Sequence, residues 1–272
     1  SIVRNGEFAG QTLSYVLDCW GKAAVGKKAS AYKDFPVLIK LIDAKDRLSV
    51  QVHPDNDYAL KNEGEYGKTE MWYVVDCDEG AELIYGFNQN ISQGEFLERI
   101  SSNNLLPVLN YVPVKKGDVF FIEAGTLHAI GKGILIAEVQ QNSNTTYRVS
   151  DYGRLGADGK PRELHIKQAV DVTKTQKPTR PYGNVGEVTL YPFGTVRELA
   201  KCEYFTTELI NIDGNVGIYD DDGFISLIVL DGDITMSYPD GMMHLKKGSS
   251  VFIPAGLKTR LSGKAQIIYT HM

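Results

Sequence analysis

The chain is poor in cysteine and has no long apolar run. Its three cysteines, Cys19, Cys77 and Cys202, lie far apart and form no Cys-x-x-Cys pair. An odd number of distant cysteines is a poor basis for a disulfide framework or a thiolate zinc site, so we expect reduced packing residues. No stretch approaches the roughly 20 unbroken apolar residues of a membrane-spanning helix, and the N-terminal residues lack the layout of an export signal. We therefore predict a cytoplasmic protein with no membrane partner.

The chain also lacks an excess of positive charge. It carries 29 Lys and Arg against 34 Asp and Glu, a formal net charge of −5. Proteins that gather nucleic acid present a positive field, so we expect no nucleic-acid partner, and an anionic ligand must be held by local charge. An apolar share of 43% in 272 residues is enough for a buried core, in one large or two ordinary domains.

What the sequence contains instead is a succession of short β-type runs separated by Gly, Pro, Asn and Asp. This pattern predicts an all-β barrel or sandwich. Helical periodicity interrupts it at residues 11–21 and 93–106, where Ser92 and Glu95 form a capping box, and both helices are expected outside a sheet. The expected strands are residues 37–42, 48–52, 71–77, 82–86, 119–122, 134–139, 145–149, 224–229, 233–238 and 248–253.

The chain repeats itself once. Residues 116–125 read KGDVFFIEAG and residues 247–256 read KGSSVFIPAG, each ahead of a further strand. A polar, proline-rich passage at residues 174–183 lies between the copies and is typical of a linker. We therefore predict two β units of one type, residues 1–183 and residues 184–272.

Only five histidines occur, so each can be considered by itself. Three of them have no acidic or imidazole partner at ligand-like spacing, and we expect surface or hydrogen-bonded side chains there: His165, His244 and His271. His53 differs because it ends the run Ser49-Val-Gln51-Val-His53, in which strand alternation puts Ser49, Gln51 and His53 on one face. If that face points into a barrel, an amide oxygen and an imidazole project into it together.

Glu70 stands at the entry to the next strand, and His128 follows the repeated turn as Gly125-Thr-Leu-His128. Two imidazoles, one carboxylate and one amide oxygen suit a divalent ion such as zinc, with positions left open for substrate. The alternative is four unrelated polar residues on separate strands. The repeat favours the metal site, because the second copy keeps its glycines but reads Gly256-Leu-Lys-Thr259 and offers no ligand.

Several segments together resemble a known family. The pattern Gly117-x5-Glu123-x-Gly125-x2-His128 resembles the second cupin motif, with Glu123 in place of Pro. More narrowly, LSVQVHPD at 48–55, GKTEMW at 67–72, GTLHAIG at 125–131 and EVQQNSNTTYR at 138–148 resemble the class I mannose-6-phosphate isomerases of the short bacterial type. The match runs in order over nearly the whole chain.

The resemblance implies an all-β dominated fold of two cupin-like barrel or jelly-roll units with a few helices outside. It implies a catalytic unit at residues 1–183 and a smaller metal-free unit at 184–272. It further implies one zinc ion per chain, a phosphorylated hexose as substrate, and an active-site arginine at Arg148. The implied zinc ligands are Gln51, His53, Glu70 and His128.

Two departures from the family pattern stand out. The chain begins without Met at a point internal to that pattern, which predicts a preceding segment that contributes strands to the first unit. Asn144 stands where family members carry Asp, which removes one carboxylate from the acid–base candidates.

Interconversion of an aldose and a ketose moves a proton from C2 to C1, and it needs a base, an electrophile and an anchor. A metal with open positions would be the Lewis acid. Arg148 presents a planar fork of donors for an enediolate or a phosphate, although a surface arginine at a strand end is the alternative. Lys68 shares a strand face with Glu70 and offers a second cation, with an exposed loop lysine as its alternative.

Glu138 follows an apolar strand and is a candidate proton carrier, or else a group that orients Arg148; the base stays unassigned. Ser49 and Lys40 are the candidate substrate-binding residues, because Ser49 shares the ligand face and a charge within the apolar strand at 37–42 needs a partner. The aromatic pair Trp72 and Tyr73 suits either a sugar-stacking platform or the core, and we favour the core.

These residues support a metal site, and the resemblance implies the reaction: a zinc-dependent isomerase that interconverts mannose 6-phosphate and fructose 6-phosphate, expected as a monomer or homodimer. One alternative is a non-catalytic cupin that binds sugar or metal. Another is an iron dioxygenase on the same barrel, which Gln51 as an added ligand disfavours.

Overall fold

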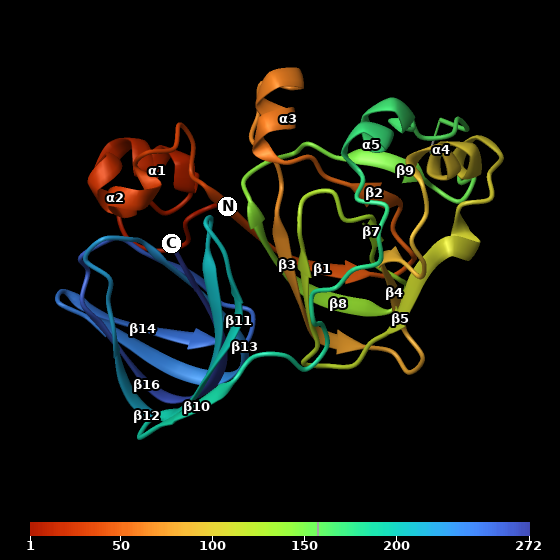
Figure 1. Ribbon diagram of the computed structural model, residues 1–272. Coiled ribbons are helices and arrows are strands. Elements are labelled where there is room, and N and C mark those ends of the chain that lie inside the picture. Colours follow the sequence, from red (N-terminus) through yellow and green to blue (C-terminus); the bar gives the residue numbers. More distant parts are fainter. Residues whose placement is uncertain (157) are drawn as a thin grey trace. The chain divides into compact units, whose positions relative to one another are not determined.

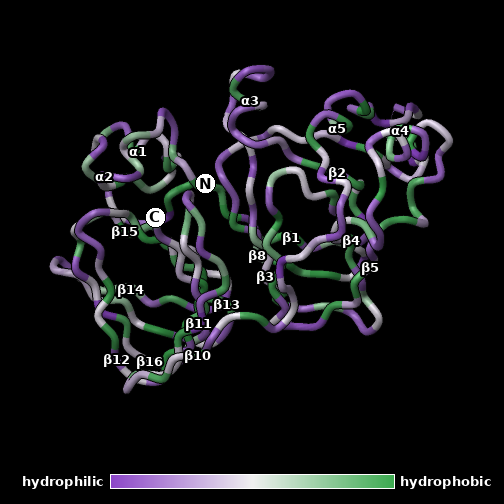
Figure 2. The backbone as a smooth tube through the Cα atoms, viewed as in Figure 1, coloured by the Kyte–Doolittle hydropathy of each residue, from purple (hydrophilic) through white to green (hydrophobic). Residues whose placement is uncertain are grey.

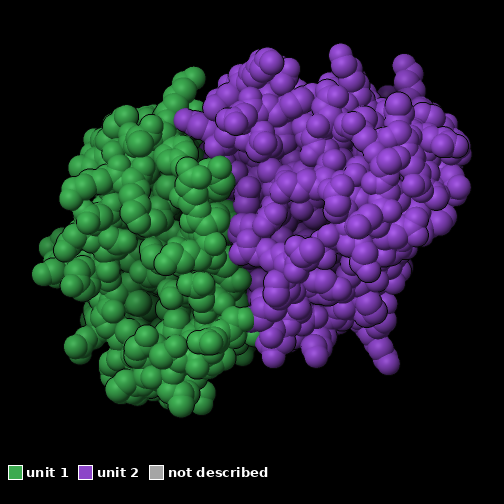
Figure 3. Space-filling model, in the orientation of Figure 1, with its two compact units in different colours: residues 1–37, 186–272 green, residues 38–185 purple. Residues whose placement is uncertain are grey.

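The computed structural model describes residues 1–156 and 158–272, and these residues form two compact units (Figure 3). Unit 1 combines Ser1–Val37 with Gly186–Met272, and unit 2 is Leu38–Val185. The chain passes from unit 2 to unit 1 within a few residues of the expected boundary at 183/184. The N-terminal residues differ from expectation, because they lie with the C-terminal part of the chain.

Aromatic packing and backbone hydrogen bonds explain why the N-terminal segment joins unit 1. The ring of Phe35 lies 4.5 Å from that of Phe224 and 5.9 Å from that of Phe252. The amide of Phe224 donates to the carbonyl of Val25, and the amide of Lys27 donates to the carbonyl of Asp222. The helices of this segment are α1 (Leu13–Trp20), η1 (Lys22–Val25) and α2 (Gly26–Ala29), and α1 matches the helix expected at 11–21.

Unit 2 consists of two sheets and several short helices (Figure 1). The four-stranded sheet has the order β1 (Val37–Ala44), β8 (Ile134–Gln141), β3 (Glu70–Cys77) and β6 (Val119–Ile122). The five-stranded sheet has the order β5 (Leu109–Pro113), β4 (Glu82–Phe87), β7 (His128–Ala129), β2 (Val50–Val52) and β9 (Tyr147–Ser150).

Alternation along β2 determines which side chains reach the interior of unit 2. Val50 and Val52 pack in one apolar cluster with Phe96 of helix α4 (Gln93–Ser101) and Ala169 of helix α5 (Ile166–Val172). Gln51, between them, therefore projects from the opposite face of the sheet. A second apolar cluster joins residues of both sheets: Trp72, Val74, Leu83, Tyr85, Phe120 and Ile122. Figure 2 shows hydrophobic stretches, in green, along strands of both sheets of unit 2.

Unit 1 has a seven-stranded sheet. Its core is an apolar cluster that includes Ile225, Leu227, Leu261 and Ile267. The strands expected at 224–229 and 233–238 are one strand, with a register shift between Val229 and Asp231. The hydrogen-bonded order is β10 (Val188–Tyr191), β11 (Gly194–Lys201), β12 (Thr206–Ile218), β16 (Thr259–His271), β13 (Ile225–Tyr238) and β14 (Gly241–Lys246), and β15 (Ser250–Ile253) also pairs with β13.

The fold is mostly β, as the sequence predicts, but the expected barrel closure is not found. Among the described residues both sheets of unit 2 and the sheet of unit 1 have unpaired edge strands. Helix α4 ends at Ser101, short of the predicted 106, because Asn103 has a φ of +52° and Pro107 follows. Helix α3 (Asn56–Asn62) was not expected. In the described part of the chain, no helix combines the length and the apolar character needed to cross a membrane.

The two copies of the repeated segment have the same local backbone at their first glycine. Gly117 and Gly248 both have positive φ, and their amides donate to Val74 and Val229 over 2.8 Å in each copy. The segment expected as a linker, residues 174–183, packs against the rest of unit 2. The amide of Ile91 donates to the carbonyl of Thr175, and the ring of Tyr182 stacks on that of Phe120.

Candidate metal centre

Strand register gathers the predicted site residues of the five-stranded sheet in a row. Gln51 on β2 lies opposite His128 on β7 and opposite Arg148 on β9. Directly opposed residues of neighbouring strands share a face of the sheet. The three side chains therefore project on the face that Gln51 occupies, away from α4 and α5.

Two glycines bring the separate segments of the site together. The amide of Gly125 donates to the carbonyl of His53 over 2.8 Å, which places the turn before His128 against His53. Gly67 comes so close to the chain at Asp55 that a Cβ there would lie 2.3 Å from the Asp55 carbonyl carbon. A side chain at residue 67 would therefore move the start of β3, where Lys68 and Glu70 stand.

Both candidate histidines are oriented through their Nδ1 atoms. Nδ1 of His53 lies 2.9 Å from the carbonyl oxygen of Thr145, and Nδ1 of His128 lies 2.8 Å from that of Thr126. A carbonyl only accepts, so Nδ1 carries the proton in each ring and Nε2 presents a lone pair. This is the arrangement in which metal-binding histidines are usually held.

The lone pairs of three buried groups converge on one point. Nε2 of His128 lies 3.3 Å from Oε1 of Glu70, and Nε2 of His53 lies 3.7 Å from Oε2. The ligand atoms of the three residues lie within 4.8 Å of one another, and all three side chains are almost fully buried. Neither oxygen of Glu70 has a hydrogen-bond partner among the described residues. Two neutral imidazole nitrogens and a carboxylate that accepts no hydrogen bond from the described residues, facing one another in a buried site, are a donor set that fits a metal ion.

Lys68 and Gln51 lie at the edges of this group. The ammonium of Lys68 is 2.7 Å from Oε2 of Glu70, without the direction of a hydrogen bond, and 3.0 Å from Nε2 of His53. Ligation of an ion by His53 would use the same lone pair, so Lys68 would have to give up that contact. The amide nitrogen of Gln51 is 3.3 Å from Nε2 of His128, and half a turn of the amide would bring its oxygen to the group.

Burial keeps both imidazoles neutral. It lowers the pKa of His128 to about 3. Burial and, next, the nearby Lys68 ammonium lower the pKa of His53 well below its usual value. Neutral imidazoles are available as ligands without first losing a proton.

Arg148 projects beside this group and is half-buried. Its Nε donates to Oγ of Ser49 over 3.4 Å, and its Nη1 donates to the carbonyl of Glu163 over 2.9 Å. Burial and, next, the charge of Arg162 lower the pKa of Arg148, although the guanidinium stays cationic at neutral pH. Ser49 and Arg148 thus lie together, a contact that the sequence did not predict.

Glu138 belongs to a second set of contacts, on the four-stranded sheet. Its Oε1 accepts from the ammonium of Lys40 over 2.9 Å, and its Oε2 accepts from the indole N–H of Trp72 over 3.0 Å. Lys40 also donates to Oε1 of Gln140. Glu138 therefore pairs with Lys40, and the structure contains no Glu138–Arg148 ion pair among the described residues.

Several residues stand apart from the site or were missed. Asn144 is exposed, and His244 pairs with Asp233 at an exposed position, an acidic partner that its sequence neighbours did not indicate. Trp72 is fully buried, as the core interpretation predicts, and so offers no face to a sugar. The contact of Trp72 with Glu138 was not foreseen, because only the register of β3 against β8 places these residues opposite each other.

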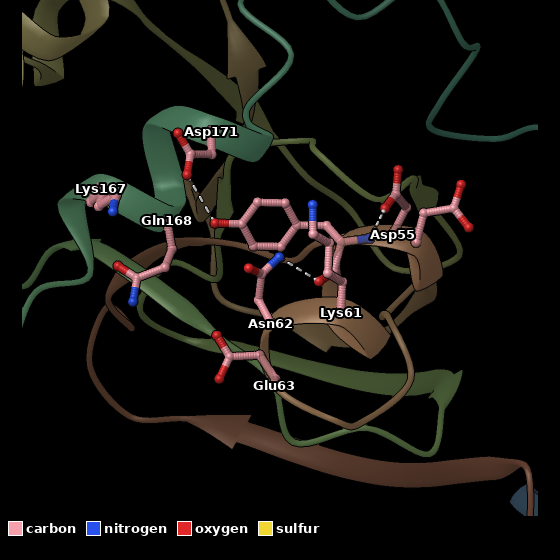
Figure 4. A pocket seen from close by; sticks show the side chains of 9 residues that line it. Asp55, Lys61, Asn62, Glu63, Lys167, Gln168 and Asp171 are labelled. Atoms are coloured by element: carbon pink, nitrogen blue, oxygen red, sulfur yellow. Dashed lines mark hydrogen bonds between the residues drawn. The ribbon is translucent and has the colours of Figure 1, made fainter.

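A polar pocket of about 720 Å³ lies elsewhere in unit 2, between α3 and α5 (Figure 4). Its lining includes Asp55, Tyr58, Glu63 and Asp171, and the hydroxyl of Tyr58 donates to Asp171. None of the predicted metal or substrate residues lines it.

Comparison with known proteins covers the chain from end to end. A family model described as "Phosphomannose isomerase type I, catalytic domain" matches residues 1–81, and one described as "Mannose-6-phosphate isomerase, cupin domain" matches residues 195–272. Mannose-6-phosphate isomerase of Streptococcus mutans is 39% identical over 272 residues, which is 100% of this chain and 84% of that protein. Mannose-6-phosphate isomerase ManA of Bacillus subtilis is 38% identical over 274 residues, 100% of this chain and 85% of that protein. A crystal structure of the mannose 6-phosphate isomerase from Bacillus subtilis matches with a TM-score of 0.88 and 36% identity, and covers 100% of this chain and 85% of that one.

Proposed function

Because the chain belongs to the type I mannose-6-phosphate isomerase family, we propose that it interconverts mannose 6-phosphate and fructose 6-phosphate with one zinc ion per chain. The observation that carries the proposal is the buried group of His53, Glu70 and His128, whose carboxylate accepts no hydrogen bond from the described residues. The reaction itself is taken from the names of the relatives.

His53, Glu70 and His128 would hold the zinc ion, with Gln51 as a fourth ligand after rotation of its amide. When bound, zinc supplies a Lewis acid for the oxygens on C1 and C2 of the sugar. A carboxylate and neutral nitrogen ligands match the preference of zinc, and four protein ligands can leave room for substrate when the metal expands its coordination.

Glu138 is the proton-transfer group of the proposal. Its carboxylate takes the proton from C2 of the aldose, which leaves an enediolate, and returns the proton to C1, while the hydroxyl proton on O2 passes to O1. Lys40 stabilises the charged form of this carboxylate through its contact with Oε1. In this scheme Lys40 acts on the sugar indirectly, by holding the carboxylate of Glu138.

Arg148 and Lys68 supply positive charge, and Ser49 holds Arg148. Nε of Arg148 is occupied by Ser49 and one Nη1 hydrogen by Glu163, which directs the remaining donors of the fork outward for an enediol oxygen or a phosphate. Once freed from His53, Lys68 can donate to a sugar oxygen beside Glu70.

The finer fold is part of the same proposal. We take unit 2 as the catalytic cupin-like unit and the part of unit 1 after residue 186 as a metal-free unit of the same type. The cytoplasmic location and the monomeric or homodimeric state stay predictions.

A coupled assay tests the proposal. Fructose 6-phosphate formed from mannose 6-phosphate is followed before chelation, after chelation, and after zinc is added back. We expect turnover to disappear with the chelator and to return with zinc. His128→Ala should lose bound zinc, whereas His244→Ala, at an exposed histidine of unit 1, should behave as the unaltered chain. A folded, zinc-loaded chain without turnover would favour the non-catalytic binding protein instead.

A further inference from the structure

The carboxylate of Glu138 is held by two donors that differ in rigidity. Lys40 approaches Oε1 from a side chain that is 38% exposed, so this ammonium can move with solvent. Trp72 approaches Oε2 with an indole that is fully buried. The indole therefore defines the position of the carboxylate more firmly than the ammonium does.

The packing of Trp72 fixes the direction of its N–H. The indole contacts the ring of His128 edge-on, at 5.3 Å between centroids and 81° between planes. It also lies in the apolar cluster between the sheets with Phe120 and Ile122. A ring enclosed in this way cannot change rotamer without disturbing the core. Trp72 thus connects the imidazole of one candidate zinc ligand to the carboxylate of Glu138.

The geometry points to Trp72 as a positioning residue for the isomerisation, which acts by fixing the Glu138 carboxylate through its indole N–H. This inference rests on the proposed function of Glu138 as the proton-transfer group. Transfer between adjacent carbons needs one carboxylate oxygen aimed at both C1 and C2, and an indole N–H donates to Oε2 whether Glu138 is charged or protonated. Misplacement of a reacting group by about 1 Å costs up to about 100-fold in rate, and the cost falls on turnover because the group does not bind substrate.

The first test is Trp72→Phe, which removes the N–H and keeps an aromatic ring. We expect kcat to fall about 10- to 100-fold, with KM within about twofold of the unaltered value and zinc content unchanged. Trp20→Phe is the matched control, because Trp20 is the other of the two tryptophans in the sequence and lies exposed on α1. The control should leave kcat, KM and zinc content unchanged.

Because phenylalanine leaves space in the core, a second variant keeps the shape of the indole. In the Trp20→Phe chain, Trp72 is the only tryptophan, so incorporation of 3-benzothienylalanine replaces its N–H by sulfur at that position alone. We expect the same loss of kcat as in Trp72→Phe. Full turnover of the benzothienyl chain would overturn the inference, because the ring would be present and the donor absent.

A double-mutant cycle with Glu138→Gln shows through which residue Trp72 acts. If Trp72 works through Glu138, Trp72→Phe should cause no further loss in the Glu138→Gln chain. An equal loss in both backgrounds would assign Trp72 a packing role and overturn the inference, while the proposed function would stand. Normal turnover of Glu138→Gln would instead overturn the proton-transfer role of Glu138 in the proposed function, and the inference with it.

Discussion

The two units build the same turn, yet only one of them gathers metal ligands among the described residues. In unit 2, Gln51 lies opposite His128, and in unit 1 the corresponding pair is Ile218 and Thr259. The carbonyl that accepts from the amide of Gly125 belongs to His53, and the one that accepts from Gly256 belongs to Asp220.

The remaining ligand follows the same correspondence. Glu70 lies opposite Ile122 of the first copy of the repeat, and Ile225 lies opposite Ile253, at the same place in the second copy. The backbone hydrogen bonds of the template are thus kept in both units, whereas its inward side chains differ. The candidate metal site is therefore a property of a few side chains, carried by a framework that does not depend on them.

The polar groups at these positions are hydrogen-bonded in unit 1, whereas in unit 2 the carboxylate of Glu70 has an ion-pair partner, Lys68, but accepts no hydrogen bond within the described part of the chain. The hydroxyl of Thr259 donates to the carbonyl of Ile218, and Oδ1 of Asp220 accepts from the amide of Gly223. Neither oxygen of Glu70 accepts a hydrogen bond from the residues that the structure describes. The described groups of unit 1 therefore call for no ion at these positions, whereas in unit 2 an ion would give the carboxylate of Glu70 a further partner besides Lys68.

The largest expected effect comes from giving unit 2 the residue of unit 1 at position 128. His128→Thr should lower zinc affinity by more than about 100-fold, because loss of a direct ligand exceeds the 10- to 100-fold typical of residues behind the ligands. Turnover should fall with zinc content, measured by mass spectrometry of the metal. Thr259→Ala in unit 1 should keep zinc and turnover and cost about 1 kcal/mol of stability. Loss of zinc in that control would end the assignment of the site to unit 2.

Arg148→Ala should separate chemistry from metal binding. We expect zinc content to be unchanged and kcat to fall about 100- to 1,000-fold, as when one preorganised donor to developing charge is removed. Steady-state kinetics on a zinc-loaded sample measure this effect. If kcat of Arg148→Ala were unchanged, the proposed role of Arg148 in turnover would be wrong.

Replacing the charged pair of unit 2 with apolar residues should stabilise the metal-free protein. In Lys68→Met/Glu70→Leu, the buried charges are replaced by side chains of similar size, as Ile225 replaces Glu70 in unit 1. We expect the free energy of unfolding in chelator to rise by about 1–4 kcal/mol. In excess zinc the order should reverse, because only the unaltered chain gains binding energy. Denaturant unfolding with zinc and with chelator measures both free energies. A double variant that is less stable than the unaltered chain in chelator would contradict the account.

The smallest effect compares the two equivalent glycines. Gly256 has a φ of +78°, and a Cβ added there would meet no described atom within 4 Å, so Gly256→Ala should cost only about 1–2 kcal/mol of backbone strain. A Cβ at Gly125 would lie 2.8 Å from the carbonyl oxygen of Val172, so Gly125→Ala should cost more and also weaken zinc binding through His128. Thermal unfolding measures the stability cost of each variant, and metal content measures its zinc binding. Equal costs would mean that the turn of unit 2 is no more constrained than that of unit 1.

The metal group could be predicted from the sequence because local rules place its members. Alternation along residues 49–53 and the repeated glycine turn are local patterns, and they indicated His53 and His128 without knowledge of strand order. The contacts of Glu138 could not be predicted in this way. They depend on the register between β3, β8 and β1, which no single segment encodes.

Two features of the fold also could not be predicted from the sequence, for physical reasons. Strands β12 and β16 continue through Gly214 and Gly263, which lie directly opposite each other with φ near +140°. A glycine within a strand pattern indicates a break, although here two of them face each other and the pairing continues. The N-terminal segment joins unit 1 through contacts such as Phe35–Phe224, between residues far apart in the chain, which local periodicity does not reveal.

The most direct measurement is an anomalous difference map from crystals of the zinc-loaded chain, recorded at the zinc absorption edge. The account predicts one strong peak per chain, within coordination distance of Nε2 of His53, Nε2 of His128 and the carboxylate of Glu70, and no peak beside Thr259. A peak at another place in the chain, or an absence of density between these three side chains at saturating zinc, would contradict it.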